Sequence, residues 1–190
     1  MQDVVVNPAV HAVDDTTHVV IRPRRRKWRA VADAMVLSVI LFLFGQTFLV
    51  QGYQVFGSCM EPNLATGQRL LGSKVALLGG VQRGDVVVFR PPHKPETAFI
   101  KRVVALPGET LEIRDSKVYV NGKQLDEPYL HREWHDDRPA EKIKPGMVFV
   151  MGDNRDNSND SRAWGELPID NIQAKAWVRY WPLENFELIR

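Results

Sequence analysis

Residues 30–50 form a nearly continuous apolar run, and a basic segment from Arg22 to Arg29 directly precedes it. A membrane-spanning helix needs about 20 predominantly apolar residues, so this run is long enough to cross a bilayer. A basic block beside such a run is more typical of the cytoplasmic flank of a membrane helix than of a nucleic-acid-binding tail. We therefore expect one transmembrane anchor, a lipid bilayer as partner and no nucleic acid.

The alternative for this segment is a cleaved signal peptide, which also combines a basic start with an apolar core. The basic block begins only at Arg22, however, and the apolar run is long for the core of a signal peptide. An uncleaved anchor at residues 30–50 is therefore favoured. The positive-inside rule then places residues 1–29 in the cytoplasm and residues 51–190 outside it, and residues 1–21 are expected to form a flexible tail.

Residues 51–190 carry short apolar and β-branched runs that glycine and proline separate. Such a pattern is typical of a mostly β fold, here a barrel or a sandwich. Strands are expected at residues 86–89, 99–104, 111–113, 117–120, 147–151 and 174–181. Asn121-Gly122 predicts a tight hairpin turn, because both residues tolerate positive φ. Residues 131–137 are charged and turn-like, and we expect an exposed loop there.

The chain contains a single cysteine, Cys59, in the segment Gly57-Ser58-Cys59-Met60-Glu61-Pro62-Asn63-Leu64. One cysteine excludes an intrachain disulfide and a Cys-rich metal site. Free cysteine is often just a small buried core residue. The position of Cys59 within this motif favours a nucleophile instead, because a thiol ionises more readily than a serine hydroxyl.

Lys101 lies in the apolar run Phe99-Ile100-Lys101-Arg102-Val103-Val104 and is the candidate general base. An exposed lysine is protonated at neutral pH, so a lysine can accept a proton only where burial disfavours its charged form. Strand alternation would place Lys101, Val103 and Ala105 on one face. Spacing alone favours the alternative, a solvated lysine on an edge strand.

The loop from Gly152 to Arg162 is dense in hydrogen-bonding groups. Ser158 is placed to orient the lysine amine without adding charge, and Asp160 and Arg162 can pair and brace the loop. The alternative is a solvated, Asx-rich turn. The backbone N–H of Cys59 and the hydroxyl of Ser58 are the candidate oxyanion donors.

These segments together resemble the bacterial type I signal peptidases (leader peptidases), which are membrane-anchored proteases with a Ser/Lys dyad. The resemblance runs from the anchor to the C-terminus, and its boxes occur in the family's order. They are residues 55–64, 83–89, 100–109 and 152–162. The resemblance implies a signal-peptidase-like β domain at the outer face of the bacterial cell (inner) membrane.

One departure from the family concerns the nucleophile. The residue before Met-x-Pro is the catalytic serine in the family, whereas it is Cys59 here and Ser58 lies one position early. A shift by one residue redirects the side chain, so Ser58 is not expected to take over. A working thiol enzyme, an impaired enzyme and a laboratory substitution all remain open. Asn63 stands where the family usually has threonine. Gly57 stands where some members have a serine whose hydroxyl contributes to the oxyanion hole.

The resemblance further implies roles and a substrate. Lys101 is the base, Ser158 orients it, and Asp160 and Arg162 brace the site. The substrate is the signal peptide of an exported preprotein, which the family cuts after an Ala-x-Ala pattern. The first substrate pocket corresponds to Val55, Met60, Leu64, Phe99 and Ile100, for which ordinary core packing is the alternative. No metal or organic cofactor is implied, and the pair His131 and His135 lacks a third ligand.

Two other functions compete with a protease. An impaired scaffold of the same fold would bind signal peptides without cutting them, and the cysteine favours it, whereas the intact Lys101 and Ser158 boxes oppose it. A self-cleaving repressor-type protease uses similar chemistry. Its family carries a DNA-binding helical domain, however, and an apolar anchor stands in that place here.

Overall fold

The computed structural model describes residues 25–94 and 96–189. The predicted cytoplasmic tail up to residue 24, including Arg22, lies outside the described residues. The chain divides into two compact units, which meet between Ile40 and Leu41. The first unit contains most of helix α1 (Arg25–Phe48), and the second contains all the strands.

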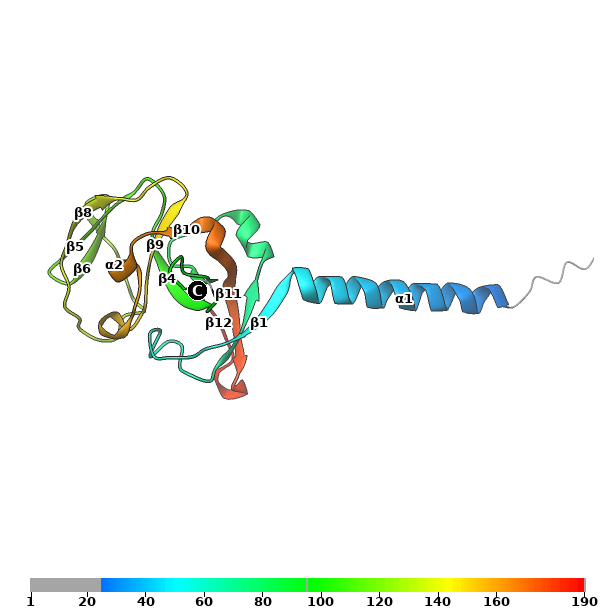
Figure 1. Cartoon of the computed structure of the whole chain (residues 1–190). Helices are drawn as coiled ribbons and strands as arrows, with labels where there is room; N and C mark the ends of the chain where they lie inside the picture. Colours follow the sequence, from blue (N-terminus) through cyan, green and yellow to red (C-terminus); the bar gives the residue numbers. More distant parts are fainter. Residues whose placement is uncertain (1–24, 95, 190) are drawn as a thin grey trace, which may run out of the picture. The chain divides into compact units, whose positions relative to one another are not determined.

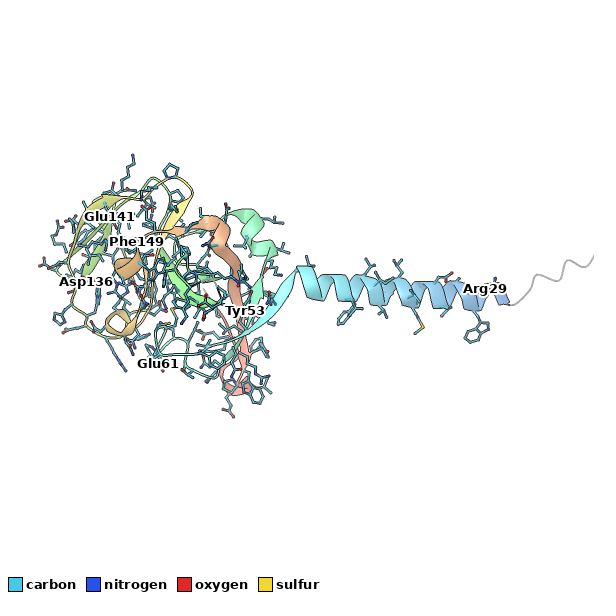
Figure 2. The ribbon with its side chains drawn as sticks, viewed as in Figure 1. Arg29, Tyr53, Glu61, Asp136, Glu141 and Phe149 are labelled. Atoms are coloured by element: carbon cyan, nitrogen blue, oxygen red, sulfur yellow. The ribbon has the colours of Figure 1, made fainter. Side chains whose placement is uncertain are left out.

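Helix α1 (Arg25–Phe48) carries exposed apolar side chains between Trp28 and Leu43, among them Met35, Ile40 and Phe42. Figure 2 shows side chains projecting from this helix, with Arg29 labelled near its N-terminal end. Within residues 25–94 and 96–189, no helix combines the length and apolar character that a membrane crossing requires. The expected helical anchor at residues 30–50 also ends earlier than predicted, because Val50 already belongs to the first strand.

The second unit is built from twelve described strands and short helical turns (Figure 1). The strands are β1 (Val50–Gln54), β2 (Arg69–Ser73), β3 (Val86–Phe89), β4 (Phe99–Ala105), β5 (Thr110–Arg114), β6 (Lys117–Val120), β7 (Lys123–Gln124), β8 (Arg138–Lys142), β9 (Met147–Met151), β10 (Leu167–Pro168), β11 (Ile172–Trp181) and β12 (Glu187–Leu188). The helical turns are η1 (Val75–Gly79), η2 (Arg155–Asn157), α2 (Ser161–Trp164), η3 (Ile169–Asn171) and η4 (Leu183–Asn185). The prediction of a mostly β fold is confirmed.

The strands form two antiparallel sheets. The larger has the order β1-β2-β11-β3-β4-β9-β10, with β12 paired to β11, and the smaller has the order β7-β6-β5-β8. Figure 1 shows β5, β6 and β8 grouped together, apart from β1, β11 and β12. Strand β4 therefore lies in the interior of the larger sheet, between β3 and β9. Strand β1 lies at one end of it, with a single strand partner, β2.

Strands β4 and β9 are covered on both faces. Phe149 and Met151 of β9 pack into a cluster with residues of β5 and β6, whereas Val148 and Val150 pack on the opposite face. Figure 2 labels Phe149, which is fully buried. Burial on both faces explains why β9 is a continuous apolar run and not an alternating one. It also makes this pair of strands a rigid support for neighbouring loops.

Each of the six predicted strands corresponds to an observed one, within two residues at each end. Asn121 and Gly122 form the predicted hairpin turn, with φ of 52° and 76° between β6 and β7. The predicted alternation along β4 fails after Val103. The register with β9 shifts between Val103 and Ala105, and this irregularity places Ala105 in a different core cluster from Val103.

Candidate active site

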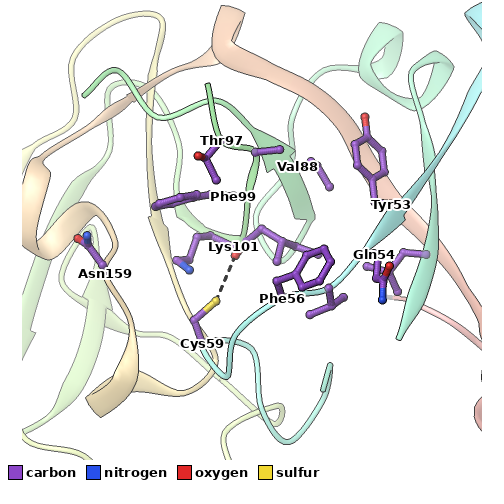
Figure 3. A pocket seen from close by; sticks show the side chains of 13 residues that line it. Tyr53, Gln54, Phe56, Cys59, Val88, Thr97, Phe99, Lys101 and Asn159 are labelled. Carbon is purple, nitrogen blue, oxygen red and sulfur yellow. Dashed lines mark hydrogen bonds between the residues drawn. The ribbon is translucent and has the colours of Figure 1, made fainter. Parts of the chain in front are cut away.

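A pocket of about 290 Å³ opens beside the loop that joins β1 to β2. Its walls are mainly apolar side chains, namely Val55, Phe56, Leu70, Val88, Phe99 and Ile100. Cys59 and Lys101 also line this pocket. Figure 3 shows both side chains there, with the Lys101 amine extending from β4 on the same side as the Cys59 sulfur. The fold therefore brings the predicted nucleophile and the predicted base to one cavity.

Cys59 lies on a turn after β1 that Gly57 makes possible, since its φ of 87° suits a residue without a Cβ atom. The thiol is half-buried and lies 3.8 Å from the carbonyl oxygen of Ile100, to which it donates (Figure 3). The next residue, Met60, is fully buried in a core cluster. Anchoring by Met60 on one side and by the Gly57 turn on the other fixes the position of the sulfur.

Lys101 is 3% exposed, although it carries an amine. Its burial follows from the interior position of β4, so the alternative of a solvated lysine on an edge strand is wrong. Within the described part of the chain, no carboxylate pairs with this amine. Its aromatic neighbour is Phe99, whose ring centre lies 5.7 Å from Nζ. The amine is therefore buried in a mainly apolar wall, without a described carboxylate beside it.

Ser158 lies where the loop after β9 meets the nucleophile turn. A Cβ atom built on Gly152 would come within 2.3 Å of Ser158 Oγ and 2.5 Å of the carbonyl oxygen of Cys59. The backbone of Gly152 thus packs directly between these two residues. Ser158 Oγ is buried and makes no well-formed hydrogen bond within the described ranges, although its hydroxyl helps to lower the pKa of Asp160.

Asp160 and Arg162 form an ion pair within this loop. The Asp160 carboxylate is fully buried and accepts hydrogen bonds from Gly152 N and from the Arg162 guanidinium at 2.9–3.0 Å. Burial raises the pKa of Asp160, but the bonds and charge of Arg162, with the Gly152 N–H, outweigh it and lower the pKa below its ordinary 3.8. For Arg162 burial acts in the opposite direction and lowers the pKa, but the hydrogen bonds and charge of Asp160 outweigh it, so the pKa of Arg162 is raised.

Two further buried ion pairs were not foreseen. Arg102 binds Asp153 through two hydrogen bonds of 2.9 and 2.8 Å, and both side chains are almost fully buried. Arg155 pairs with Glu127, which comes from the segment before β8. These pairs show that the loop from Gly152 to Arg162 is not simply a solvated turn, because the charges of Asp153 and Arg155 are neutralised inside the protein.

Two asparagines, also missed from the sequence, join this loop to the nucleophile turn. The Asn154 backbone N–H donates to the Cys59 carbonyl oxygen at 3.0 Å, and its side-chain amide donates to the Ser58 carbonyl oxygen at 3.1 Å. Asn157 Nδ2 donates to Ser58 Oγ at 2.8 Å. Because Ser58 Oγ accepts this bond, its own proton is left to donate elsewhere. An asparagine-rich loop was the only signal in the sequence for these contacts.

A family model, that of signal peptidase, peptidase S26, matches residues 28–181. The chain belongs to the signal peptidase family. A probable signal peptidase I-2 from Synechocystis is 35% identical over 173 residues, which is 88% of this chain and 79% of that protein. Signal peptidase IB from Staphylococcus aureus is 35% identical over 176 residues, or 83% of this chain and 91% of that protein. These matches do not support the alternative of an impaired scaffold.

A crystal structure of a signal peptidase I from Enterococcus faecalis shares 32% sequence identity. The matched region covers 50% of this chain and 95% of the Enterococcus faecalis chain, and the TM-score is 0.46. The family assignment rests on the sequence matches alone. A member of the signal peptidase family is a peptidase, so the prediction of a peptide-bond hydrolase is confirmed.

The five residues predicted for substrate binding in this signal peptidase fall into two groups. Val55, Phe99 and Ile100 line the pocket beside Cys59. Met60 and Leu64 lie in the core cluster around the nucleophile turn, with 0% and 3% of their surface exposed, and do not line that pocket. For these two, the placement fits the alternative of core packing. Within residues 25–94 and 96–189, no cluster of side chains has the composition of a metal site.

Proposed function

We propose that this chain removes signal peptides from exported preproteins, with Cys59 as nucleophile and Lys101 as general base. Membership of the signal peptidase family supports the reaction. The single observation that supports the two roles is the burial of Lys101, without a described carboxylate partner, in the wall of the pocket that Cys59 also lines. A base and a nucleophile in one apolar cavity are the minimum that side-chain peptidase chemistry needs.

The proposed reaction begins with transfer of the thiol proton from Cys59 to the Lys101 amine. The sulfur attacks the carbonyl carbon of the scissile bond and forms a tetrahedral adduct. Lys101 then returns its proton to the departing amine, the C–N bond breaks, and the signal peptide stays on Cys59 as a thioester. Water, deprotonated by Lys101, releases it. The Ser158 hydroxyl, which is buried and makes no well-formed hydrogen bond among the described residues, would orient the amine.

The oxyanion of the adduct would be held by the backbone N–H of Cys59 and by the Ser58 hydroxyl. The 2.8 Å bond from Asn157 supports the second role, since it leaves the Ser58 proton free to donate. Asp160 and Arg162 act at a distance from the reacting atoms. They hold Gly152 in place through the bond from its N–H to Asp160, and Gly152 packs against Cys59 and Ser158.

The substrate would bind as an extended strand with an Ala-x-Ala sequence before the cut. Strand β1 supports this mode, because it ends the larger sheet and its Tyr53 and Gln54 line the pocket. An extended peptide can add to such an edge through backbone hydrogen bonds, while side-chain pockets select its residues. Val55, Phe99 and Ile100 are then the residues that contact its small side chains.

We also propose that residues 30–50 anchor the chain in the bacterial cell membrane, with residues 1–29 cytoplasmic and residues 51–190 on the outer side. The exposed apolar side chains of α1 and the basic segment before it support this topology. The test is extraction of membranes with alkaline carbonate. The full chain should stay in the membrane pellet, and its complete release would contradict the anchor.

The decisive test of the catalytic proposal compares Cys59→Ala and Lys101→Met with the wild type, using an Ala-x-Ala peptide in detergent micelles. Both variants should lose cleavage, and iodoacetamide should abolish it in the wild type. Urea unfolding of each variant shows whether the fold is intact. Lys94→Met, which alters an exposed lysine, is the matched control and should cleave normally. Normal cleavage by a fully alkylated enzyme would exclude Cys59.

A further inference from the structure

The thiol at the nucleophile position has a consequence beyond cleavage. We propose that this enzyme also transfers the acyl fragment from Cys59 to the α-amine of a second peptide, so that it joins peptides as well as cutting them. The inference rests on the proposed function, because it needs the Cys59 thioester. The donor is a peptide with small residues before the cut, and the acceptor is a peptide with a free N-terminus.

The chemistry follows from the tetrahedral adduct that carries both a sulfur and a nitrogen. A thiolate leaves this adduct readily, whereas an amine leaves only after it is protonated. This preference works against cleavage of an amide, because the adduct tends to return to substrate. It works in favour of transfer. When an amine attacks the Cys59 thioester, the new C–N bond is kept, the C–S bond breaks, and the amine proton passes through Lys101 to the thiolate.

The pocket favours an amine over water in this second step. Val55, Phe99 and Ile100 present apolar surface beside Cys59, and no carboxylate or imidazole lies among the described residues that line the cavity. Hydrolysis depends on a water molecule that only the few polar side chains of the lining, among them Gln54, Thr97 and Asn159, can hold, with Lys101 as the basic group. A peptide amine needs less help, because it is intrinsically the stronger nucleophile and its own chain can bind the protein.

The acceptor class follows from ionisation. An α-amino group has an ordinary pKa of about 8, so a large fraction is neutral at pH 8, whereas a lysine side chain with a pKa of about 10.4 is almost wholly charged. Peptide N-termini are therefore the expected acceptors, in preference to lysine side chains. The yield of transfer should rise between pH 7 and pH 8.5, as more α-amine becomes neutral.

The experiment uses the full chain in detergent micelles with a fluorophore-labelled Ala-x-Ala peptide and the dipeptide amide Ala-Glu-NH₂ as acceptor. Mass spectrometry measures the ratio of joined product to hydrolysed product. The N-acetylated dipeptide is the control that lacks an amine, and Cys59→Ser is the matched enzyme. We expect a ratio at least about tenfold higher for the thiol enzyme than for Cys59→Ser, a change in relative barriers of about 1.4 kcal/mol.

Each outcome decides between the proposals. A ratio for the wild type equal to or below that of Cys59→Ser would overturn transfer and leave the peptidase intact. Donor that remains uncut would overturn both. If Cys59→Ser fails to fold, the wild type still provides a test. Joined product should then grow in proportion to the acceptor and replace hydrolysed product, and its absence at high acceptor concentration would refute the inference.

Discussion

Replacing Gly152 with alanine would place a methyl group where three parts of the site meet. The new Cβ atom would lie 2.3 Å from Ser158 Oγ and 2.5 Å from the Cys59 carbonyl oxygen. Cβ atoms essentially never approach other heavy atoms within 3.0 Å, so both neighbours must move. The Cys59 oxygen is backbone and already accepts a bond from Asn154 N, so its displacement moves the nucleophile itself.

The magnitude follows from these contacts. Overpacking of a dense site costs about 1–3 kcal/mol of folding stability. Misplacement of a catalytic group by about 1 Å costs about 100-fold in rate. For Gly152→Ala we therefore expect kcat/KM to fall about 10- to 100-fold, while the free energy of unfolding falls by only about 1–3 kcal/mol.

The assay combines cleavage of an Ala-x-Ala peptide with urea unfolding. Gly79→Ala is the matched control, because a Cβ atom there meets no heavy atom within 4 Å. The control should change stability by less than about 0.5 kcal/mol and leave cleavage unaltered. If Gly152→Ala cleaved at the rate of the wild type, the close packing of Gly152 against Cys59 and Ser158 would not position the nucleophile.

Three further predictions concern the surrounding contacts. Asp153→Ala leaves the Arg102 guanidinium buried without its carboxylate, so the free energy of unfolding, measured in urea, should fall by about 3–5 kcal/mol. The double replacement of Arg102→Met with Asp153→Leu should restore much of this loss. The pKa of Asp160 is lowered in the folded chain, so the stability that its charged form contributes is present above its ordinary pKa of 3.8 and is lost as the pH falls through the lowered value. The free energy of unfolding should therefore decrease when the pH is lowered below about 4, and this decrease should be less steep in Asp160→Asn. Asn157→Ala should lower kcat about tenfold with little change in KM, by releasing Ser58, and it should add no further loss in a Ser58→Ala background.

The predicted strands are of two kinds, since β5, β6 and β11 alternate in burial, whereas β3, β4 and β9 are mostly apolar in succession. Strands β3 and β9 are buried on both faces, and that burial selects the continuous valine and methionine runs that made them visible. Strand β8 was missed because Arg138-Pro139-Ala140-Glu141-Lys142 pairs along only one edge and is mostly exposed or half-buried. Its strand conformation comes from its pairing with β5 and not from its own residues.

The position of Lys101 could not be decided from its neighbours. Whether a strand is interior or at an edge depends on strand order, which links β4 to β9 across more than forty residues. The shift in register after Val103 is equally invisible in the local sequence. The motifs identified the catalytic candidates, whereas the pairs of Arg102 with Asp153 and of Arg155 with Glu127 join distant segments and emerged only from the fold.

The central claim is that the acyl fragment of the substrate passes through the sulfur of Cys59. Mass spectrometry of the enzyme, quenched in acid during cleavage of an Ala-x-Ala peptide, tests it directly. The account predicts an adduct with the mass of the N-terminal fragment, located on Cys59 and absent from Lys101→Met. Undiminished cleavage by Cys59→Ala, with no adduct on the wild type, would contradict it.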